Sequence, residues 1–391
     1  MGIFKKIKSP NNLVLVFDVG SSSVGAAFFR TQKSGVPRII YSIREPILLE
    51  KNIDPERFLE SSLKSFELIV KKVASKGIGV PAKVFCVLSS PWYASQTRII
   101  KLEKDESFVF DTKLADSLID KEVKAFKDEH FSNFIGEEDK IRIIELKNMK
   151  ISLNGYTISS PLNQKVKSVE MMVFFSMSPE NVLLKLERII DAHYHGKEVK
   201  FSSFSIASFT VARDTFVLQD NFLLVDIGGE ITDISMIKKD IICSSISFPL
   251  GRNFMIREVA LALKCSLSEA KSFISLFKDG HAIESLEKKL EPIIDDIKTK
   301  WLKGFQESLV SVSNDISIPA SIFITVDQDL ADFFSKIIKT EQFSQYTLTE
   351  AKFRTIFLGT EALHGIAIVD KNMAHDAFLI IESIYINRFL R

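Results

Sequence analysis

The chain has 391 residues, of which 26% are charged and 46% are hydrophobic, and its formal net charge is +1 at pH 7. This length can support two or more domains with a sizeable core, and the composition is that of a globular protein rather than a disordered one. Because there is no basic excess, the charge balance does not support nucleic-acid binding, and we expect no nucleic acid among the partners.

Membrane-spanning and targeting segments are not expected. The start, MGIFKKIK, is basic, but the apolar run from Leu13 to Phe17 is cut by Asp18, unlike a signal peptide. No apolar run reaches the roughly 18 residues that a spanning helix needs. We therefore expect a cytoplasmic protein. The cysteines lack CxxC and metal-ligand spacing and are interpreted as buried, reduced thiols: Cys86, Cys243 and Cys265.

Strand and helix patterns alternate along the chain, which predicts an α/β fold. Residues 54–76 and 112–129 have apolar side chains at helical spacing, whereas 84–88 is a short buried strand. Strand-like runs broken by turns fill 141–177. The later elements are predicted as helices over 178–192, 253–277 and 281–313, and a strand over 320–326 that leads into a helix.

An internal repeat is the most informative feature. Residues 14–30 read VLVFDVGSSSVGAAFFR, and residues 222–238 read FLLVDIGGEITDISMIK. Superposing them aligns Asp18 with Asp226 and Gly20 with Gly228. Each segment predicts a β-hairpin with an acid near the end of its first strand. Two copies indicate two related domain halves.

The hairpin tips suit phosphate and metal chemistry. Tips rich in Gly and Ser expose several backbone N–H groups, which can hold phosphate oxygens. Carboxylates beside them suit a Mg²⁺ ion. We expect the metal to be held by Asp18 and Asp226, and the phosphates by Gly20, Ser21, Ser22, Ser23, Gly228 and Gly229. Glu230 is the one acid considered as a catalytic base, and it is otherwise interpreted as a solvated turn residue.

These segments resemble the phosphate loops of the actin-like ATPases of the FtsA/PilM type. The first loop resembles residues 18–24 and the second residues 226–233, where Glu230 followed by Thr232 is similar to PilM-type proteins. The resemblance covers roughly residues 13–370. It implies an actin-like (ribonuclease H-like) fold with duplicated domains around a nucleotide cleft, ATP and Mg²⁺ as cofactors, and nucleotide contacts from Glu230, Thr232 and Thr325.

The resemblance also implies a domain order. We expect the first subdomain over residues 1–82, a small inserted strand-helix-strand-strand domain of the SHS2 kind over 83–177, and the rest of the first half with the second half over 178–391. FtsA and PilM imply a scaffold at the cytoplasmic face of the membrane in cell division or pilus assembly. The implied partners are further copies of the chain, division-ring or pilus-assembly proteins, and the membrane surface through a peripheral contact.

The adenosine loop departs from the family. The expected Thr-Gly-Gly reads Thr325-Val326-Asp327-Gln328, and the helix at 268–278 carries Lys271 and Ile274 where the family has Glu and Lys. Branched side chains there would crowd a nucleoside. Three functions stay open: an ATP-binding scaffold with at most slow turnover, a pseudo-ATPase scaffold that works through protein contacts alone, and an enzyme such as a sugar kinase or polyphosphatase.

Residues 378–391 (FLIIESIYINRFLR) allow two interpretations. They have apolar side chains at helical spacing with two arginines, as in an amphipathic membrane anchor. The same pattern fits a last element packed on the body. The basic N-terminus is a second candidate anchor.

Overall fold

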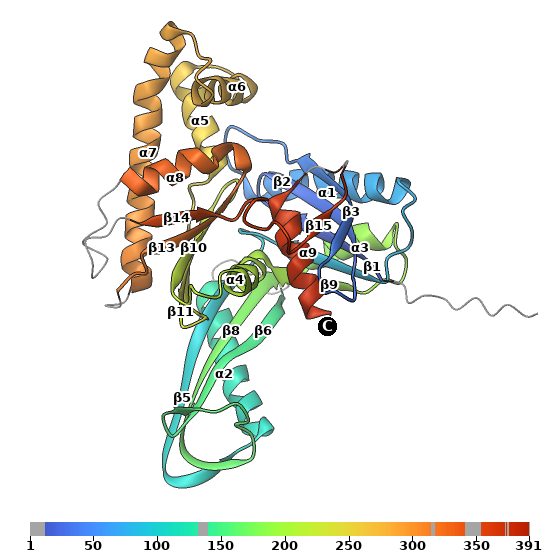
Figure 1. Cartoon of the computed structure of the whole chain (residues 1–391), viewed down its shortest axis with the longest axis vertical. Coiled ribbons are helices and arrows are strands. Elements are labelled where there is room, and N and C mark those ends of the chain that lie inside the picture. Colours follow the sequence, from blue (N-terminus) through green and yellow to red (C-terminus); the bar gives the residue numbers. More distant parts are fainter. Residues whose placement is uncertain are drawn as a thin grey trace, which may run out of the picture.

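The computed structural model describes residues 12–131, 140–313, 317–340, 353–371, 373 and 375–390. Within them, the strands form three sheets, two in a main body and one that projects from it (Figure 1). The predicted α/β fold class is confirmed.

The first sheet has six strands and carries the first copy of the repeated hairpin. Its order is β15 (Ile368–Val369), β3 (Arg38–Pro46), β2 (Ser23–Arg30), β1 (Leu13–Val19), β4 (Lys83–Leu88) and β9 (Val199–Ser203). The antiparallel β1–β2 pair sets Asp18 opposite Gly25. Strands β4 and β9 continue the sheet in parallel, and β9 is its last strand.

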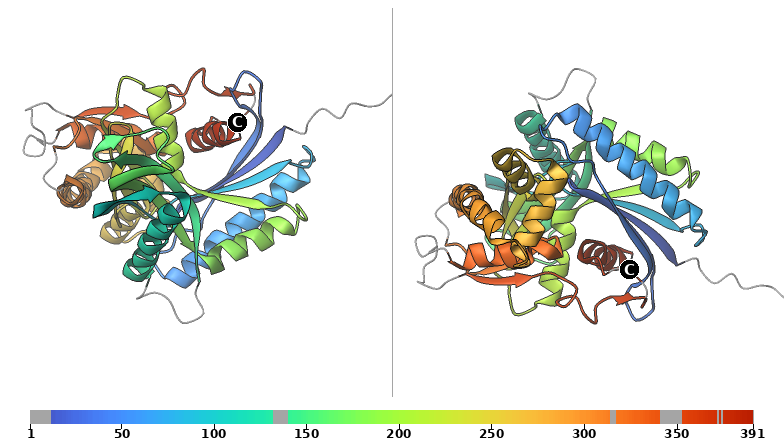
Figure 2. Two further views of the ribbon diagram at one scale, coloured as in Figure 1. Left: turned by 90° about the horizontal axis from the view of Figure 1, so that it is seen from below. Right: turned by 90° about the horizontal axis from the view of Figure 1, so that it is seen from above.

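Helices cover both faces of this sheet. The outer face packs on α1 (Pro55–Ser75) and α3 (Glu180–Asp191), and the inner face on α4 (Phe204–Thr215) and α9 (Ala377–Phe389) (Figure 2). Helix α1 begins where the Asp54 carboxylate accepts a 2.9 Å hydrogen bond from the Arg57 backbone N–H, with Pro55 in the first turn. The α3 helix begins at Glu180, later than predicted, because Ser178 still belongs to a strand and its hydroxyl donates to the Trp92 carbonyl.

The second sheet repeats the hairpin on the other half. Its order is β12 (Ile241–Phe248), β11 (Thr232–Lys238), β10 (Phe222–Ile227), β13 (Ser321–Val326) and β14 (Arg354–Phe357). One face packs on α5 (Arg252–Leu263), α6 (Leu267–Lys278), α7 (Glu284–Ser313) and α8 (Ala331–Thr340), and the other on α4 and α9. The predicted helix over 253–277 is two helices, because Lys264 has a left-handed φ of 53° and Ser266 caps the next helix.

The projecting sheet has the order β5 (Ala94–Phe110), β8 (Gln164–Pro179), β6 (Ile141–Leu153) and β7 (Tyr156–Thr157), and α2 (Thr112–Phe131) packs on one face. Short β7 pairs only with the end of β6, at Ser152 and Leu153. Most of one edge of β6 therefore has no strand partner among the described residues.

The C-terminal helix belongs to the core. In α9, Leu379, Ile381 and Ile386 are buried between the two sheets of the body. These side chains are not available to a membrane, so residues 378–390 are the packed element and not the anchor. The candidate anchor at residues 1–11 lies outside the described residues. No described helix has both the length and the apolarity needed to cross a membrane.

Candidate functional sites

The two hairpin tips pack directly against each other. The Glu230 backbone N–H donates a 3.0 Å hydrogen bond to the Ser21 hydroxyl. A Cβ added at Gly229 would lie 2.6 Å from the Ser22 backbone nitrogen, so only glycine fits. The tips do meet across the cleft as predicted, but they touch where a polyphosphate was expected to lie.

The space left between the tips is small. Asp18 and Asp226 line one cavity of about 30 Å³, together with the tip residues Gly20, Ser21, Ser22, Ser23, Gly228 and Gly229. Such a volume holds one or two water molecules, whereas small-molecule sites measure roughly 300–1,000 Å³. The predicted phosphate and metal residues are thus brought together, around a gap between the hairpin tips that is too small for a polyphosphate.

Asp18 is already paired with a positively charged side chain of the protein. Its carboxylate accepts a 2.7 Å hydrogen bond from the Arg44 guanidinium on β3. Arg44 also donates to Asp376, at 2.6 Å, and to the Ser23 hydroxyl, at 3.0 Å. Burial raises the pKa of Asp18, and Arg44 opposes that rise. Arg44 was not among the residues predicted from the sequence. The one sequence signal for it is Gly25, opposite Asp18, because a Cβ there would lie 2.9 Å from the guanidinium.

A second buried acid lies beside Asp18. Glu382, on α9, is fully buried, and neither of its carboxyl oxygens has another hydrogen-bond partner among the described residues. Burial and repulsion by Asp18 raise the pKa of Glu382 well above its ordinary value. Burial beside Asp18 thus disfavours a negative charge on Glu382.

Asp226 is held within its own half. The Thr325 hydroxyl donates a 2.7 Å hydrogen bond to it, so Thr325 faces this carboxyl and not a nucleoside. Burial, with repulsion by Asp233, raises the pKa of Asp226 well above its ordinary value. In the described residues no cluster of three or more His, Cys, Asp or Glu side chains is placed to hold a metal ion. Asp18 and Asp226 are thus both engaged within the protein in this arrangement, by Arg44 and Thr325.

Glu230 is buried and ion-paired, which corrects its interpretation as a solvated turn residue. Its carboxylate accepts two 2.7 Å hydrogen bonds from Arg257 and one of 2.7 Å from Asn253. Arg257 also donates to the Glu50 carbonyl of the first half, at 2.9 Å. A carboxylate so fully engaged is not free to activate water, and the ion pair joins the two halves at the mouth of the cleft.

The remaining predicted contacts also have partners inside the protein. The fully buried Thr232 donates to the Leu250 carbonyl at 2.7 Å and accepts from the Trp301 indole at 3.3 Å, so it faces α7 and not the cleft. Asp327, in the altered adenosine loop, forms an ion pair with Arg252. Lys271 and Ile274 line a cavity of only about 80 Å³ beside it. Ile274 also lines a neighbouring cavity of about 360 Å³ together with Gln328 of the altered loop, so the adenosine region is only partly filled by this chain's own side chains.

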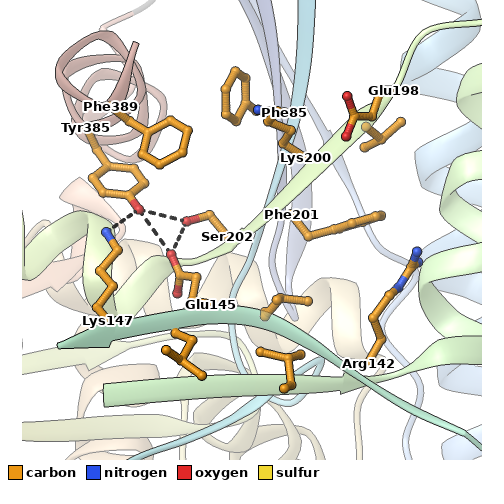
Figure 3. Close-up of a pocket in the computed structure, with 14 residues that line it drawn as sticks. Phe85, Arg142, Glu145, Lys147, Glu198, Lys200, Phe201, Ser202, Tyr385 and Phe389 are labelled. Carbon is orange, nitrogen blue, oxygen red and sulfur yellow. Dashed lines mark hydrogen bonds between the residues drawn. The ribbon is translucent and has the colours of Figure 1, made fainter. Parts of the chain in front are cut away.

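A larger groove lies elsewhere, where the projecting sheet joins the body (Figure 3). Its volume is about 370 Å³, and its walls come from β6, β9 and the end of α9. Aromatic and cationic side chains line it: Phe85, Phe201, Tyr385, Phe389, Arg142, Lys147 and Lys200. No motif marks this groove in the sequence. The one available signal is Glu145, an acid within the otherwise strand-like run at 141–153.

Duplicated α/β halves with paired hairpins are the arrangement of the actin-like ATPase fold. The particular form of the fold is that of PilM: a structure described as a PilM–PilN type IV pilus biogenesis complex matches 98% of this chain and 99% of the other, with a TM-score of 0.62 and 12% identity. Identity at this level shows a shared fold and no more.

Two further solved structures have lower scores. The ethanolamine utilization protein EutJ from Carboxydothermus hydrogenoformans has a TM-score of 0.44 and 11% identity over 97% of this chain and 91% of the other. A Bacteroides thetaiotaomicron protein with an actin-like ATPase fold and unknown function has a TM-score of 0.40 and 9% identity over 91% of this chain and 93% of the other. No protein-family model and no curated protein sequence matches this chain.

Proposed function

We propose that this protein is an actin-fold scaffold that binds an extended segment of a partner protein in the groove between β6, β9 and α9. The gap between its hairpin tips is closed by its own residues, and we propose that partner binding does not depend on ATP. The observation that carries the proposal is the groove, which places two strand edges beside a site large enough for a peptide.

Both edges can accept a strand. Among the described residues, β9 ends its sheet, and β6 pairs on one side with β8 and on the other only with the two residues of β7. Unpaired N–H and C=O groups of an edge recruit extended segments by adding them as a further strand. Strand addition supplies affinity from the backbone, and the pockets beside it select alternate side chains.

The groove favours a segment with alternating apolar and acidic residues. Ile143, Leu146 and Phe389 present partly exposed apolar surface, with 38%, 41% and 56% of each residue accessible. Three cationic side chains line the groove, against the exposed Glu198 and the buried Glu145. A partner with carboxylates between apolar residues complements both properties.

The fold suggests the setting. The PilM structure with the same fold is described as a complex with PilN in type IV pilus biogenesis. We therefore propose a PilN-type partner and a role in pilus assembly at the cytoplasmic face of the membrane, in preference to cell division. Nucleotide binding and self-association into polymers are not required for this role.

The test is calorimetric titration of the full chain with a PilN-type protein from the same organism, and with synthetic strand-forming peptides in acidic and basic versions. We expect binding of the PilN-type protein and of acidic peptides, equal with and without Mg-ATP. Ile143→Asp should abolish binding of both, since the change puts a carboxylate in the groove. Ile99→Asp, a matched change at a 54% exposed position on β5 of the same sheet, should not. Binding that survives Ile143→Asp, or needs Mg-ATP, contradicts the proposal.

A further inference from the structure

Glu145, in the first half of β6, lines the groove and lies close to Ser202 and Tyr385 (Figure 3). Its carboxylate accepts hydrogen bonds from the Ser176 hydroxyl at 3.0 Å, from the Tyr385 hydroxyl at 3.1 Å and from the Ser203 backbone N–H at 3.2 Å. The hydroxyls of Ser202 and Ser203 also donate to it. Both of its oxygens are therefore fully engaged.

These donors come from both sides of the groove. Glu145 and Ser176 belong to the projecting sheet, on β6 and β8, whereas Ser202 and Ser203 lie on β9 and Tyr385 on α9. No strand pairing joins β6 to β9 in the described part of the chain. The single carboxylate thus links the projecting sheet to two elements of the body, directly beneath the groove.

Lys147 reinforces the link from the same strand. Its ammonium donates a 2.8 Å hydrogen bond to the Tyr385 hydroxyl and lies 4.8 Å from the centre of the Tyr385 ring. Lys147, Ser202 and Tyr385 all line the groove as well as forming the link. The polar cluster is therefore part of the groove wall, and movement of any member changes the distance between the two strand edges.

We propose that Glu145 is the positioning residue of the groove: it holds the edges of β6 and β9 at the spacing that admits an extended peptide. A fully satisfied buried network fixes one arrangement, because each displaced donor leaves an unpaired polar group. Apolar contacts alone would hold the sheets together without fixing their register. The positioning role rests on the proposed peptide-binding function. The contact of Glu145 with β9 and α9 can nevertheless be tested without a peptide.

The experiment compares wild type with Glu145→Gln, Glu145→Ala and Glu198→Gln. The last variant removes an acid from the same groove without touching the link. Hydrogen exchange is followed at 141–147 and 199–203, with the core strands 13–19 and 222–227 as references for global stability. Affinity for the PilN-type protein is measured on the same samples.

We expect Glu145→Gln to speed exchange at both groove edges about tenfold or more, and to weaken partner affinity by a similar factor, with the reference strands unchanged. Glu145→Ala should have a larger effect, whereas Glu198→Gln should leave hydrogen exchange at both edges as in wild type. Unchanged exchange at the edges in both Glu145 variants overturns the positioning role, and so does loosening with unchanged affinity. Absence of partner binding to wild type counts against the proposed function instead, and the exchange data still decide whether Glu145 sets the edges.

Discussion

Arg44 donates a 2.7 Å hydrogen bond to Asp18 at the point where a metal ion was expected. The same guanidinium is bound to Asp376, at the start of α9, so the cleft and the C-terminal helix share one cation. This contact distinguishes the cleft from a site built to hold Mg-ATP.

Arg44→Met should destabilise the protein strongly. It leaves Asp18 and Asp376 without their cation, and loss of one partner from a buried ion pair costs roughly 3–5 kcal/mol. Arg38→Met is the control on the same strand, because Arg38 is 51% exposed and its pair with Asp370 is worth at most about 1 kcal/mol. Urea denaturation measures both. Equal midpoints for the two variants would mean that Arg44 does not close the cleft.

Gly229→Ala tests the contact between the hairpin tips. The added methyl meets the Ser22 backbone nitrogen at 2.6 Å, and backbone cannot move aside as a flexible side chain can. We expect a loss of about 1–3 kcal/mol in the free energy of unfolding, measured by the same denaturation. If the variant is as stable as wild type, the tips are apart in solution and the cleft is open.

Ile381→Ala tests the packing of the C-terminal helix. The side chain is fully buried, so its truncation should cost about 2–5 kcal/mol. Thermal melting and liposome co-sedimentation of the variant separate the two interpretations of residues 378–391. A variant that melts like wild type but loses liposome binding would restore the membrane anchor.

The buried charge of Glu145 predicts a pH dependence. Burial raises its pKa above the ordinary 4.5, although the serine donors and Lys147 oppose the rise, and the neighbouring Tyr385 has a raised pKa as well. A raised pKa means that the stabilising contribution is complete below pH 4.5 and is lost as the pH rises through the folded-state value. The melting temperature of wild type minus that of Glu145→Gln should therefore fall as the pH rises from about 4 to 8. A difference that grows with pH contradicts the assignment.

The fold was predictable because its signals are local. The hairpins around Asp18 and Asp226 repeat a short pattern, and their strands pair with neighbours close in sequence, so the duplication follows from the residues themselves. The run at 378–391 was ambiguous, because an apolar helix has the same spacing whether it packs on protein or on lipid.

The contacts made by the site residues could not be predicted from the sequence, because their partners are distant in sequence. Arg44 donates to Asp376, which is 332 residues away in the sequence. Glu230 lies in a turn, but it is buried because it forms an ion pair with Arg257. The groove is likewise built by β6, β9 and α9, and Glu145 meets Tyr385 only after all three have packed. Hydrophobic periodicity gives no information about such contacts between distant polar residues.

Hydrogen exchange of the full chain, measured alone, with a PilN-type protein and with Mg-ATP, distinguishes a peptide-binding scaffold from an ATP-binding protein. We predict slower exchange at 141–147 and 199–203 with the PilN-type protein, and no change at 18–23 or 226–232 with Mg-ATP. Protection of both hairpin tips by Mg-ATP, with none at the groove edges in the presence of the PilN-type protein, would contradict it.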